Sequence, residues 1–380
     1  MNEASEWQAG MLAAPVSEML QARIDAGDFP SAVYLVGERG EIRFQGAVGN
    51  AVVEPEVIAA SKETIYDVAS LTKVLVTSLL IAKLVERGDV RVDEGVGEFL
   101  GAQKLGDKAG ITIQQLLTHT SGLIAWLPFY LSEAAESVLD QIAGSRLGTA
   151  GEVVYSDLNF LLLEEVIRTV YGGRTDEIAV REINEPLGLS STYFNPPLEL
   201  RQRIAASEKG NEFERQTCIE KGFIEPDELS DKFRSYQIWG EVHDGNAWAL
   251  GGAAGHAGLF STAEEVFKIA LQFLADTTTL LKPETCQLFR TNFTPGISEH
   301  RSYGFQLAST PDSTAGTVMA PKSFGHLGFT GTSLWIDPLK ERVFILLTNR
   351  THARPIPFTN INSVRRRFHD LAISELEQLS

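Results

Sequence analysis

The sequence predicts an α+β protein in which one antiparallel sheet, built from both ends of the chain, is flanked by helices and carries an inserted, mostly helical lobe. Near the N-terminus, apolar residues at 32–36 and 42–44 flank Gly40, which is the pattern of a β-hairpin. Near the C-terminus, 334–336 and 343–347 flank a polar connection and predict a second hairpin. The chain between these hairpins carries helical patterns instead.

We expect residues 1–380 to form one unit, because no internal repeat or low-complexity tract marks a second domain. The sheet lobe is predicted to comprise residues of about 15–65 and 265–380, and the helical lobe residues of about 66–264. The segments with helical patterns are 16–26, 74–85, 113–117, 158–171, 176–184, 263–275 and 360–376. Thr112 and Thr262 are the expected N-caps of two of them. Residues 196–260 show little periodicity and predict a long irregular excursion, which is more often functional than accidental.

Composition excludes several classes of function. The formal net charge of −17 and the pI near 4.9 argue against nucleic acid and against an anionic membrane surface as partners. Cys218 and Cys286 form no CxxC pair and predict no disulfide framework. No apolar run is long enough to span a membrane, and the acidic N-terminus lacks the features of a signal peptide. We therefore expect a cytoplasmic protein, although a periplasmic or secreted chain without its export signal would look the same.

The stretch with the clearest chemistry contains Ser70 and Lys73. Ser70 precedes an apolar run with helical spacing that stops at Gly88, so Lys73 is expected one turn further on and on the same side of a helix. A serine hydroxyl becomes a good nucleophile when a nearby base takes its proton, and burial would lower the pKa of an amine toward that role. The free amides of the first turn also favour negative charge beside Ser70. The alternative is that Ser70 is a helix N-cap and Lys73 a solvated side chain.

Three other stretches contain candidate partners. Tyr155, in Tyr-Ser-Asp before a predicted helix, is a possible phenolic acid or base, and His326 lies in a glycine-rich strand whose edge a substrate backbone can approach. Residues 251–258 are too rich in glycine for a core element. Each has an ordinary explanation as well, namely a core tyrosine, a hydrogen-bonded strand histidine and a tight connection.

Taken in order, Ser-x-x-Lys at 70–73, Tyr-Ser-Asp at 155–157 and His-Leu-Gly at 326–328 resemble the serine β-lactamase and penicillin-binding-protein superfamily. The closer similarity is to class C β-lactamases, D-alanyl-D-alanine carboxypeptidases and related esterases. Residues 117–123 and 258–262 are also similar to recurrent stretches of that family, and the resemblance covers residues of about 15–375. It implies a β-lactamase/transpeptidase-like fold and a single catalytic unit.

The resemblance also implies roles for individual residues. Ser70 would be the acylated nucleophile, Lys73 and Tyr155 would share the base and acid roles, and the backbone N–H groups of Ser70 and Phe329 would form the oxyanion hole. The residues implied in substrate binding are Asp157 and His326. Gly328, on the glycine-rich strand edge, is a further candidate for substrate binding, and Trp126 is a candidate for a pocket wall, with core packing as the alternative. Phe129 and Tyr130 are further candidates for this wall, with core packing as the alternative. The family requires no cofactor or metal, and the spacing of His243, Asp244 and His256 matches no strong metal motif, so we expect neither.

Two residues depart from the family pattern. Asp157 stands where the family usually has asparagine, and an ionised aspartate cannot donate to a substrate carbonyl. His326 replaces a lysine and is mostly neutral at pH 7. Both changes remove donor or positive character from the place where the anionic end of a β-lactam would lie. An aspartate beside Lys73 would also raise the pKa of that amine, so either Asp157 points elsewhere or Tyr155 carries more of the proton transfer.

The leading hypothesis is therefore a serine hydrolase that acts through an acyl-enzyme on an ester, an amide or a D-amino-acid peptide. One alternative is a true class C-like β-lactamase or a D-alanyl-D-alanine carboxypeptidase. An alternative of another class is a non-catalytic penicillin-binding or scaffold protein, although a scaffold has no physical need to retain Ser70, Lys73 and Tyr155 together. We expect a small-molecule or peptide substrate and a monomer or small homo-oligomer.

Overall fold

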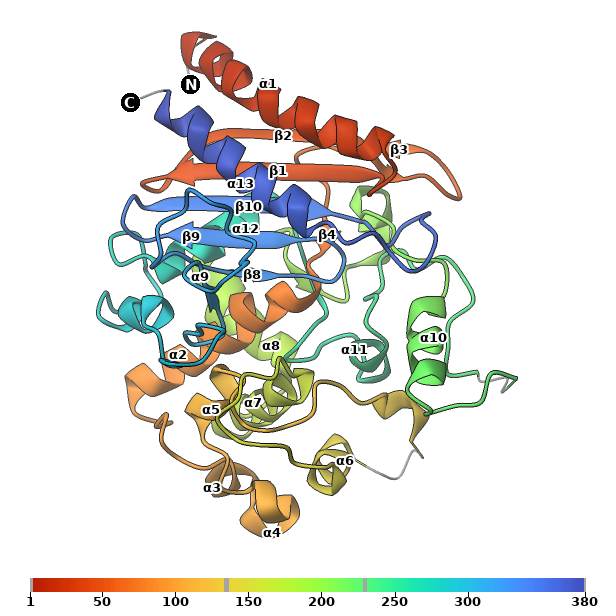
Figure 1. The fold of residues 1–380 in the computed structure, drawn as a ribbon, viewed down its shortest axis with the longest axis vertical. Coiled ribbons are helices and arrows are strands. Elements are labelled where there is room, and N and C mark those ends of the chain that lie inside the picture. The colour runs from red at the N-terminus through yellow and green to blue at the C-terminus, as the bar shows by residue number, and fades with distance from the viewer. Residues whose placement is uncertain (1–2, 133–136, 228–230, 379–380) are drawn as a thin grey trace.

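The main sheet combines strands from both ends of the chain, as predicted. The computed structural model describes residues 3–132, 137–227 and 231–378, and the sheet order is β3-β2-β1-β10-β9-β8-β7. The strands are β1 (Ser31–Glu38), β2 (Glu41–Val52), β3 (Ile58–Ala59), β7 (Gln306–Leu307), β8 (Phe324–Leu327), β9 (Ser333–Asp337) and β10 (Arg342–Thr348). Every neighbouring pair is antiparallel, and β1 from the N-terminal hairpin pairs with β10 from the C-terminal one (Figure 1).

The turns of the two hairpins follow from their residues. Between β1 and β2, Arg39 and Gly40 both have positive φ, at 54° and 78°, which is the conformation that a tight two-residue hairpin needs. The central strands are buried on both faces, and their side chains alternate between two cores. In β1, Tyr34 and Val36 belong to one core, whereas Val33 and Leu35 belong to the other. Burial on both faces explains why the sequence of this strand is almost continuously apolar.

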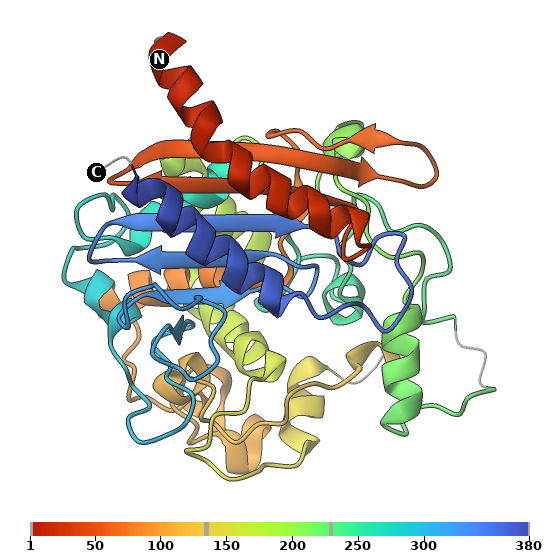
Figure 2. The ribbon, with the colours of Figure 1, turned by 45° about the horizontal axis from the view of Figure 1, so that its top comes forward.

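Helices cover both faces of the sheet. α1 (Glu3–Asp25) and α13 (Asn362–Glu377) lie side by side across one face (Figures 1 and 2). On the other face, α12 (Ala263–Ala270) packs against β1 and β10 and begins at the predicted cap, where the Thr262 side chain accepts a hydrogen bond from the Glu265 N–H. Among the described residues, no helix is both long enough and apolar enough to cross a lipid bilayer.

The remaining helices lie on the far side of α12 and form the lobe below the sheet in Figure 1. They are α2 (Leu79–Arg87), α3 (Gly97–Leu100), α4 (Ala102–Leu105), α5 (Ile113–Leu117), α6 (Val138–Gly144), α7 (Asp157–Tyr171), α8 (Thr175–Ala179), α9 (Glu185–Leu187), α10 (Glu212–Glu220) and α11 (Gly245–Ala249). The predicted cap of α5 is confirmed, because Thr112 and Gln115 form a capping box. A small sheet of β4 (Tyr66–Asp67), β6 (Leu259–Ser261) and β5 (Tyr193–Phe194) also forms here.

Residues 196–260 are less irregular than expected, because they contain α10, α11 and part of β6. The nine residues of α10 are mostly polar, and only Glu214 and Cys218 are buried. This helix therefore has no apolar stripe by which the sequence would reveal it.

Asn349, just after β10, connects three segments of the chain that are distant in sequence. Its Oδ1 accepts a hydrogen bond from the Ser31 hydroxyl at 2.7 Å, and its Nδ2 donates to the carbonyl oxygens of Ala51 at 2.9 Å and Ala206 at 3.2 Å. The side chain is buried. Removing the Asn349 amide would leave the Ser31 hydroxyl and the carbonyl oxygens of Ala51 and Ala206 without this hydrogen-bond partner.

We expect Asn349→Leu, a change that conserves approximate size, to lower the free energy of unfolding by about 2–3 kcal/mol, because buried polar groups lose their partner. The midpoint of urea unfolding measures the effect. The exposed Asn360, whose Oδ1 accepts only the Asn362 N–H at 3.0 Å, is the matched control, and Asn360→Leu should cost less than about 1 kcal/mol. Equal midpoints for the two variants would show that Asn349 does not link these segments.

Candidate active site

Ser70 lies at the start of the predicted helix. It belongs to a 3₁₀ turn (Ala69–Leu71) that continues as a π-helical segment (Lys73–Ser78) and then as α2, which ends at Gly88 with a φ of 78°. The helix and its end are confirmed, whereas the π-helical part was not predicted. The residue that precedes the 3₁₀ turn is Val68, so the alternative of Ser70 as an N-cap is wrong. The hydroxyl is therefore not used for capping.

The backbone before Ser70 is held in an unfavourable conformation. Ala69 has a φ of 48°, which costs a residue with a Cβ about 1–2 kcal/mol. The buried Asp67 carboxylate stabilises this turn, because it accepts the N–H of Ala69 and the N–H of His243, both at 2.8 Å. The Thr330 hydroxyl donates to the Asp67 carbonyl oxygen at 2.8 Å. Neighbouring elements thus determine the position of Ser70 on several sides.

Lys73 lies beneath Ser70 with a side chain that is 0% exposed. Its Nζ is 3.0 Å from Ser70 Oγ, 3.0 Å from the His256 carbonyl oxygen and 2.7 Å from Asp157 Oδ1. An ammonium group has three hydrogens to donate, and here three acceptors surround it. The geometry is that of a charged lysine.

The sequence predicted that burial would lower the pKa of Lys73, and this prediction is wrong, because the net shift is upward. Desolvation does act to lower this pKa, but the charges of Asp157 and Tyr155 and their hydrogen bonds outweigh it, so the pKa is raised. The open question about Asp157 is also answered, because its carboxylate points at the amine. Lys73 is therefore an ammonium group that is held beside Ser70, and it is not a neutral amine ready to accept a proton.

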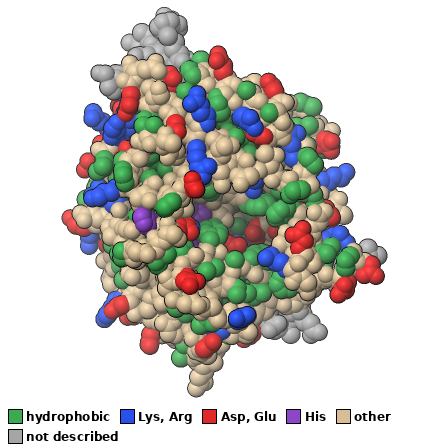
Figure 3. Space-filling model, viewed as in Figure 1, with side chains coloured by type: hydrophobic (Ala, Val, Ile, Leu, Met, Phe, Trp, Pro, Cys, Tyr) green, Lys and Arg blue, Asp and Glu red, His purple; other side chains and the backbone are tan. Residues whose placement is uncertain are grey.

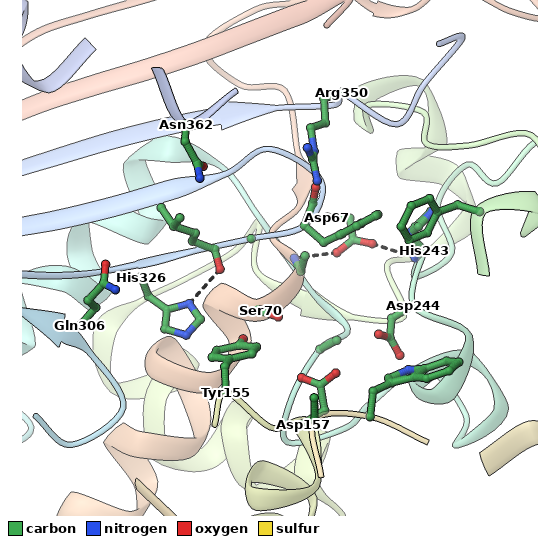
Figure 4. Close-up of a pocket in the computed structure, with 18 of the residues that line it drawn as sticks. Asp67, Ser70, Tyr155, Asp157, His243, Asp244, Gln306, His326, Arg350 and Asn362 are labelled. Carbon is green, nitrogen blue, oxygen red and sulfur yellow. Dashed lines mark hydrogen bonds between the residues drawn. The ribbon is translucent and has the colours of Figure 1, made fainter. Parts of the chain in front are cut away.

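Tyr155 approaches the same place from the loop before α7. Lys73 Nζ lies 5.1 Å from the centre of its ring, and in Figure 4 the tyrosine points from the helical lobe toward Ser70 and His326. Its position depends on His119, which the sequence analysis did not assign to the site. The His119 Nδ1 accepts the Ser156 N–H at 3.1 Å, its carbonyl oxygen accepts the Val154 N–H at 2.9 Å, and its ring lies 4.6 Å from the ring of Tyr155. The signal available in the sequence was its place in the stretch 117–123.

His326, on β8, is buried and neutral. Its Nδ1 lies 2.8 Å from the Leu327 carbonyl oxygen, so the hydrogen is on Nδ1 and Nε2 is left as an acceptor. Burial lowers its pKa well below the usual value, and the positive charges of Lys73 and Arg301 act in the same direction. The prediction of a mostly neutral side chain agrees with this environment. His326 therefore presents a polar but uncharged edge, where the family has a cation.

Phe329 lies in the turn that connects β8 to β9, close to Ser70. Gly328 must be glycine here, because a Cβ would meet the Thr332 hydroxyl at 2.0 Å and the Val68 carbonyl oxygen at 2.6 Å. The close approach brings the turn of Phe329 against the backbone before Ser70. The oxyanion hole that the resemblance implies, made of the N–H groups of Ser70 and Phe329, stays a prediction.

The predicted residues surround one cavity of about 610 Å³, visible as a hollow in Figure 3. Its lining includes Ser70, Trp126, Tyr155, Asp157, His326, Gly328 and Phe329, whereas Lys73 lies below it. Phe129 and Tyr130 are buried in the hydrophobic cores and do not belong to this lining, so packing was the correct alternative for them. In Figure 4, Arg350 and Asn362 approach from the side of the sheet, and Asp157 and Asp244 approach from the opposite side.

One group of side chains has the composition of a metal site. Ligand atoms of Asp157, Asp244 and His256 all lie within 4.8 Å of one another. Each carboxylate already has a partner, since Asp157 pairs with Lys73 at 2.7 Å and Asp244 Oδ1 lies 3.0 Å from His256 Nε2. The residues that the sequence analysis considered for a metal, His243 among them, are thus hydrogen-bonded within the protein: His243 Nε2 lies 2.7 Å from Glu208 Oε2.

Comparison with known proteins agrees with this geometry. A family model described as β-lactamase matches residues 16–364. The chain is 27% identical over 386 residues to the "Putative D-alanyl-D-alanine carboxypeptidase" of Escherichia coli strain K12, and the match covers 93% of this chain and 86% of that protein.

Two solved structures show the same fold. EstCE1, a hydrolase with promiscuous acyltransferase activity, superimposes with a TM-score of 0.72 at 20% identity, covering 98% of this chain and 100% of that one. A class C β-lactamase from Rhodobacter sphaeroides superimposes with a TM-score of 0.69 at 18% identity, covering 95% and 99%. The predicted resemblance and the β-lactamase/transpeptidase-like fold are confirmed, and the chain belongs to the β-lactamase family of serine hydrolases.

Proposed function

We propose that Ser70 is the nucleophile of this serine hydrolase and that its substrate is an ester, an amide or a D-amino-acid peptide of small size. The observation that carries the proposal is the contact of 3.0 Å between Ser70 Oγ and Lys73 Nζ at the floor of the cavity. The cavity has the volume of sites that bind small molecules. A protein that only bound its ligand would have no need of this contact.

The charged state of Lys73 assigns the proton transfer chiefly to Tyr155. Lys73 donates to three acceptors and has no lone pair to offer, so we take the phenolate form of the neighbouring Tyr155 as the base. As Ser70 Oγ forms a bond with the substrate carbonyl carbon, its proton passes to the Tyr155 oxygen, and the carbonyl electron pair becomes the oxyanion. Tyr155 then protonates the leaving alcohol or amine. In the second half, Tyr155 takes a proton from water, which attacks the acyl carbon, and the proton returns to Ser70 Oγ.

The surroundings of Ser70 favour a substrate whose binding does not require a positive charge at position 326. His326 is neutral and lies where the family lysine would bind an anionic group. The names of the relatives include both a hydrolase with acyltransferase activity and a carboxypeptidase. Ester or amide hydrolysis requires only the nucleophile, the base and the oxyanion hole, so we place it before β-lactam hydrolysis.

The second candidate is a class C-like β-lactamase or D-alanyl-D-alanine carboxypeptidase, whose substrates carry a carboxylate. Arg350 in the cavity lining favours it, because its guanidinium binds only carbonyl oxygens within the described residues. Rates with a p-nitrophenyl ester, a chromogenic cephalosporin and a peptide that ends in D-alanyl-D-alanine decide between the candidates. Fast ester release with slow hydrolysis of the other two supports the first.

We expect Ser70→Ala to abolish turnover of a p-nitrophenyl ester, because the variant loses the hydroxyl that contacts Lys73 in the cavity and would form the acyl-enzyme. Intact mass spectrometry of the wild type during turnover should show one acyl adduct on the peptide that contains residue 70. Ser78→Ala, on the same helical segment but buried below the cavity, is the control and should keep full acylation. An alanine variant at Ser70 that retains half of the activity would mean that another residue is acylated.

Lys73 and Tyr155 should behave as one proton-transfer unit. Lys73→Met and Tyr155→Phe should each lower kcat by about 10²–10⁴-fold, and the double variant should lose little more, because either change disables the pair. The matched control is Lys83→Met, which removes a lysine of α2 that pairs with Glu182 at 2.9 Å, outside the cavity. Losses that multiply in the double variant would indicate two independent roles.

Asp157→Asn should change the pH profile in a direction that tests the role of Lys73. The carboxylate is one of the groups that raise the Lys73 pKa, so its loss lowers that pKa and the ammonium becomes neutral at a lower pH. If the ammonium is required, the alkaline limb of kcat/KM moves to lower pH. If a neutral Lys73 is the base, the acidic limb moves to lower pH instead and activity rises there. Asp93→Asn, an exposed carboxylate that pairs with Arg91 at 2.7 Å, should leave the profile unchanged.

A further inference from the structure

The peptide unit between Gly328 and Phe329 carries both a donor and an acceptor that matter for the reaction. Its N–H belongs to Phe329, which lines the cavity with Ser70 and supplies an oxyanion donor in the proposed function. Its carbonyl belongs to Gly328. This peptide is trans, because the only cis bonds in the described chain are Glu54–Pro55 and Ile356–Pro357. In a trans peptide the N–H and the C=O point in opposite directions, so a group that binds the Gly328 oxygen lies behind the oxyanion donor.

The group that binds this oxygen is the guanidinium of Arg365. Its Nη2 donates to the Gly328 carbonyl oxygen at 2.8 Å and to the Thr332 carbonyl oxygen at 3.0 Å. Arg365 lies in the first turn of α13 and is 5% exposed. Gly331 N–H also donates to the Gly328 oxygen, at 3.1 Å. The carbonyl therefore accepts one neutral and one charge-assisted hydrogen bond.

Arg365 has no carboxylate as its partner within the described residues. Its other hydrogen bond runs from Nη1 to the Asn362 amide oxygen at 2.8 Å, and its pKa is lowered to about 9 by burial and by the neighbouring charge of Arg350. A buried cation that binds only neutral oxygens keeps most of its field. That field acts on the peptide whose N–H is the oxyanion donor of the proposed function.

We propose that Arg365 is a positioning residue that strengthens the Phe329 N–H as an oxyanion donor by binding the carbonyl oxygen of the same peptide. Hydrogen bonding at the C=O withdraws electron density from the N–H through the amide resonance, and this makes the N–H a stronger donor. The gain increases as negative charge grows on the substrate oxygen, so it stabilises the transition state more than the bound substrate. The inference rests on the proposed function, in which Ser70 is acylated.

Arg350 binds the neighbouring peptide of the same turn, and it shows that an arginine must bind the Gly328 carbonyl oxygen to act on the Phe329 N–H. This arginine donates through Nε to the Phe329 carbonyl oxygen at 2.6 Å, but that carbonyl belongs to the peptide whose N–H is on Thr330. Arg350 thus holds the turn without polarising the oxyanion donor. Arg365 does both, and the experiment must separate its electrostatic effect from its structural one.

The test compares Arg365→Gln and Arg365→Lys with Arg366→Gln. Arg366 follows in the same helix, but its Nε donates to the Ser313 carbonyl oxygen at 3.0 Å and it does not contact the turn. Three quantities are measured with p-nitrophenyl acetate labelled with ¹³C at the carbonyl: kcat, KM and the infrared stretching frequency of the acyl-enzyme carbonyl. Thermal unfolding of each variant reports on folding.

We expect Arg365→Gln to lower kcat about tenfold with KM within about twofold, and to move the acyl carbonyl band to higher wavenumber, because a weaker donor polarises the carbonyl less. Arg365→Lys, which keeps a cation, should be intermediate in both quantities, and Arg366→Gln should match the wild type. If Arg365→Gln does not fold, the Lys variant alone must show a partial shift together with a partial loss of kcat.

An acyl band at the wild-type position in a folded Arg365 variant with reduced kcat would overturn the inference, because packing alone would then explain the loss. Equal effects of the Gln and Lys changes on kcat would overturn it as well. Failure of the proposed function itself looks different, since the wild type would then show no acyl carbonyl band at all.

Discussion

The structure of the site depends on a single buried ammonium group. The three acceptors of Lys73 come from three distant parts of the chain: Ser70 from its own helix, Asp157 from the start of α7 and the His256 carbonyl from the loop before β6. An isolated charge at this depth would be very unfavourable, and only the full set of partners makes it tolerable. The same requirement aligns the nucleophile with the rest of the site. The aspartate that departs from the family pattern is therefore part of what keeps Lys73 charged.

Charge is distributed unevenly around the cavity. The sheet side contributes Arg350, whereas Asp157 and Asp244 lie on the opposite side, with Ser70 between them (Figure 4). His326, at the edge of the sheet, is neutral because of its burial and its cationic neighbours. In the proposed function, the chain keeps the reacting groups of the β-lactamase family, and the charge at positions 157 and 326 differs from the family pattern. Such differences at the rim of a shared catalytic centre are how one fold accommodates different substrates.

Two residues with unfavourable backbone conformations lie next to catalytic groups. Ala69, with a φ of 48°, precedes Ser70, and His119, with a φ of 58°, packs against Tyr155. Both are held by hydrogen bonds: the Ala69 N–H donates to the Asp67 carboxylate, and His119 accepts the N–H groups of Val154 and Ser156. Strain that is compensated in this way fixes side chains before the substrate binds, so less reorganisation is needed during the reaction.

The sequence by itself determined the sheet built from both termini, the helix behind Ser70 with its end at Gly88, the caps at Thr112 and Thr262, and the order of the family motifs. These features depend on local patterns, namely alternation, helical spacing, glycine at a positive φ and motif spacing. Only the tertiary structure decided that Asp157 contacts Lys73, that His119 supports Tyr155 and that Arg365 binds the turn of Phe329. Each of these contacts joins residues from different elements. The pKa of Lys73 is raised, although the sequence predicted that it would be lowered, because the balance between burial and neighbouring charge depends on distances that no local pattern encodes.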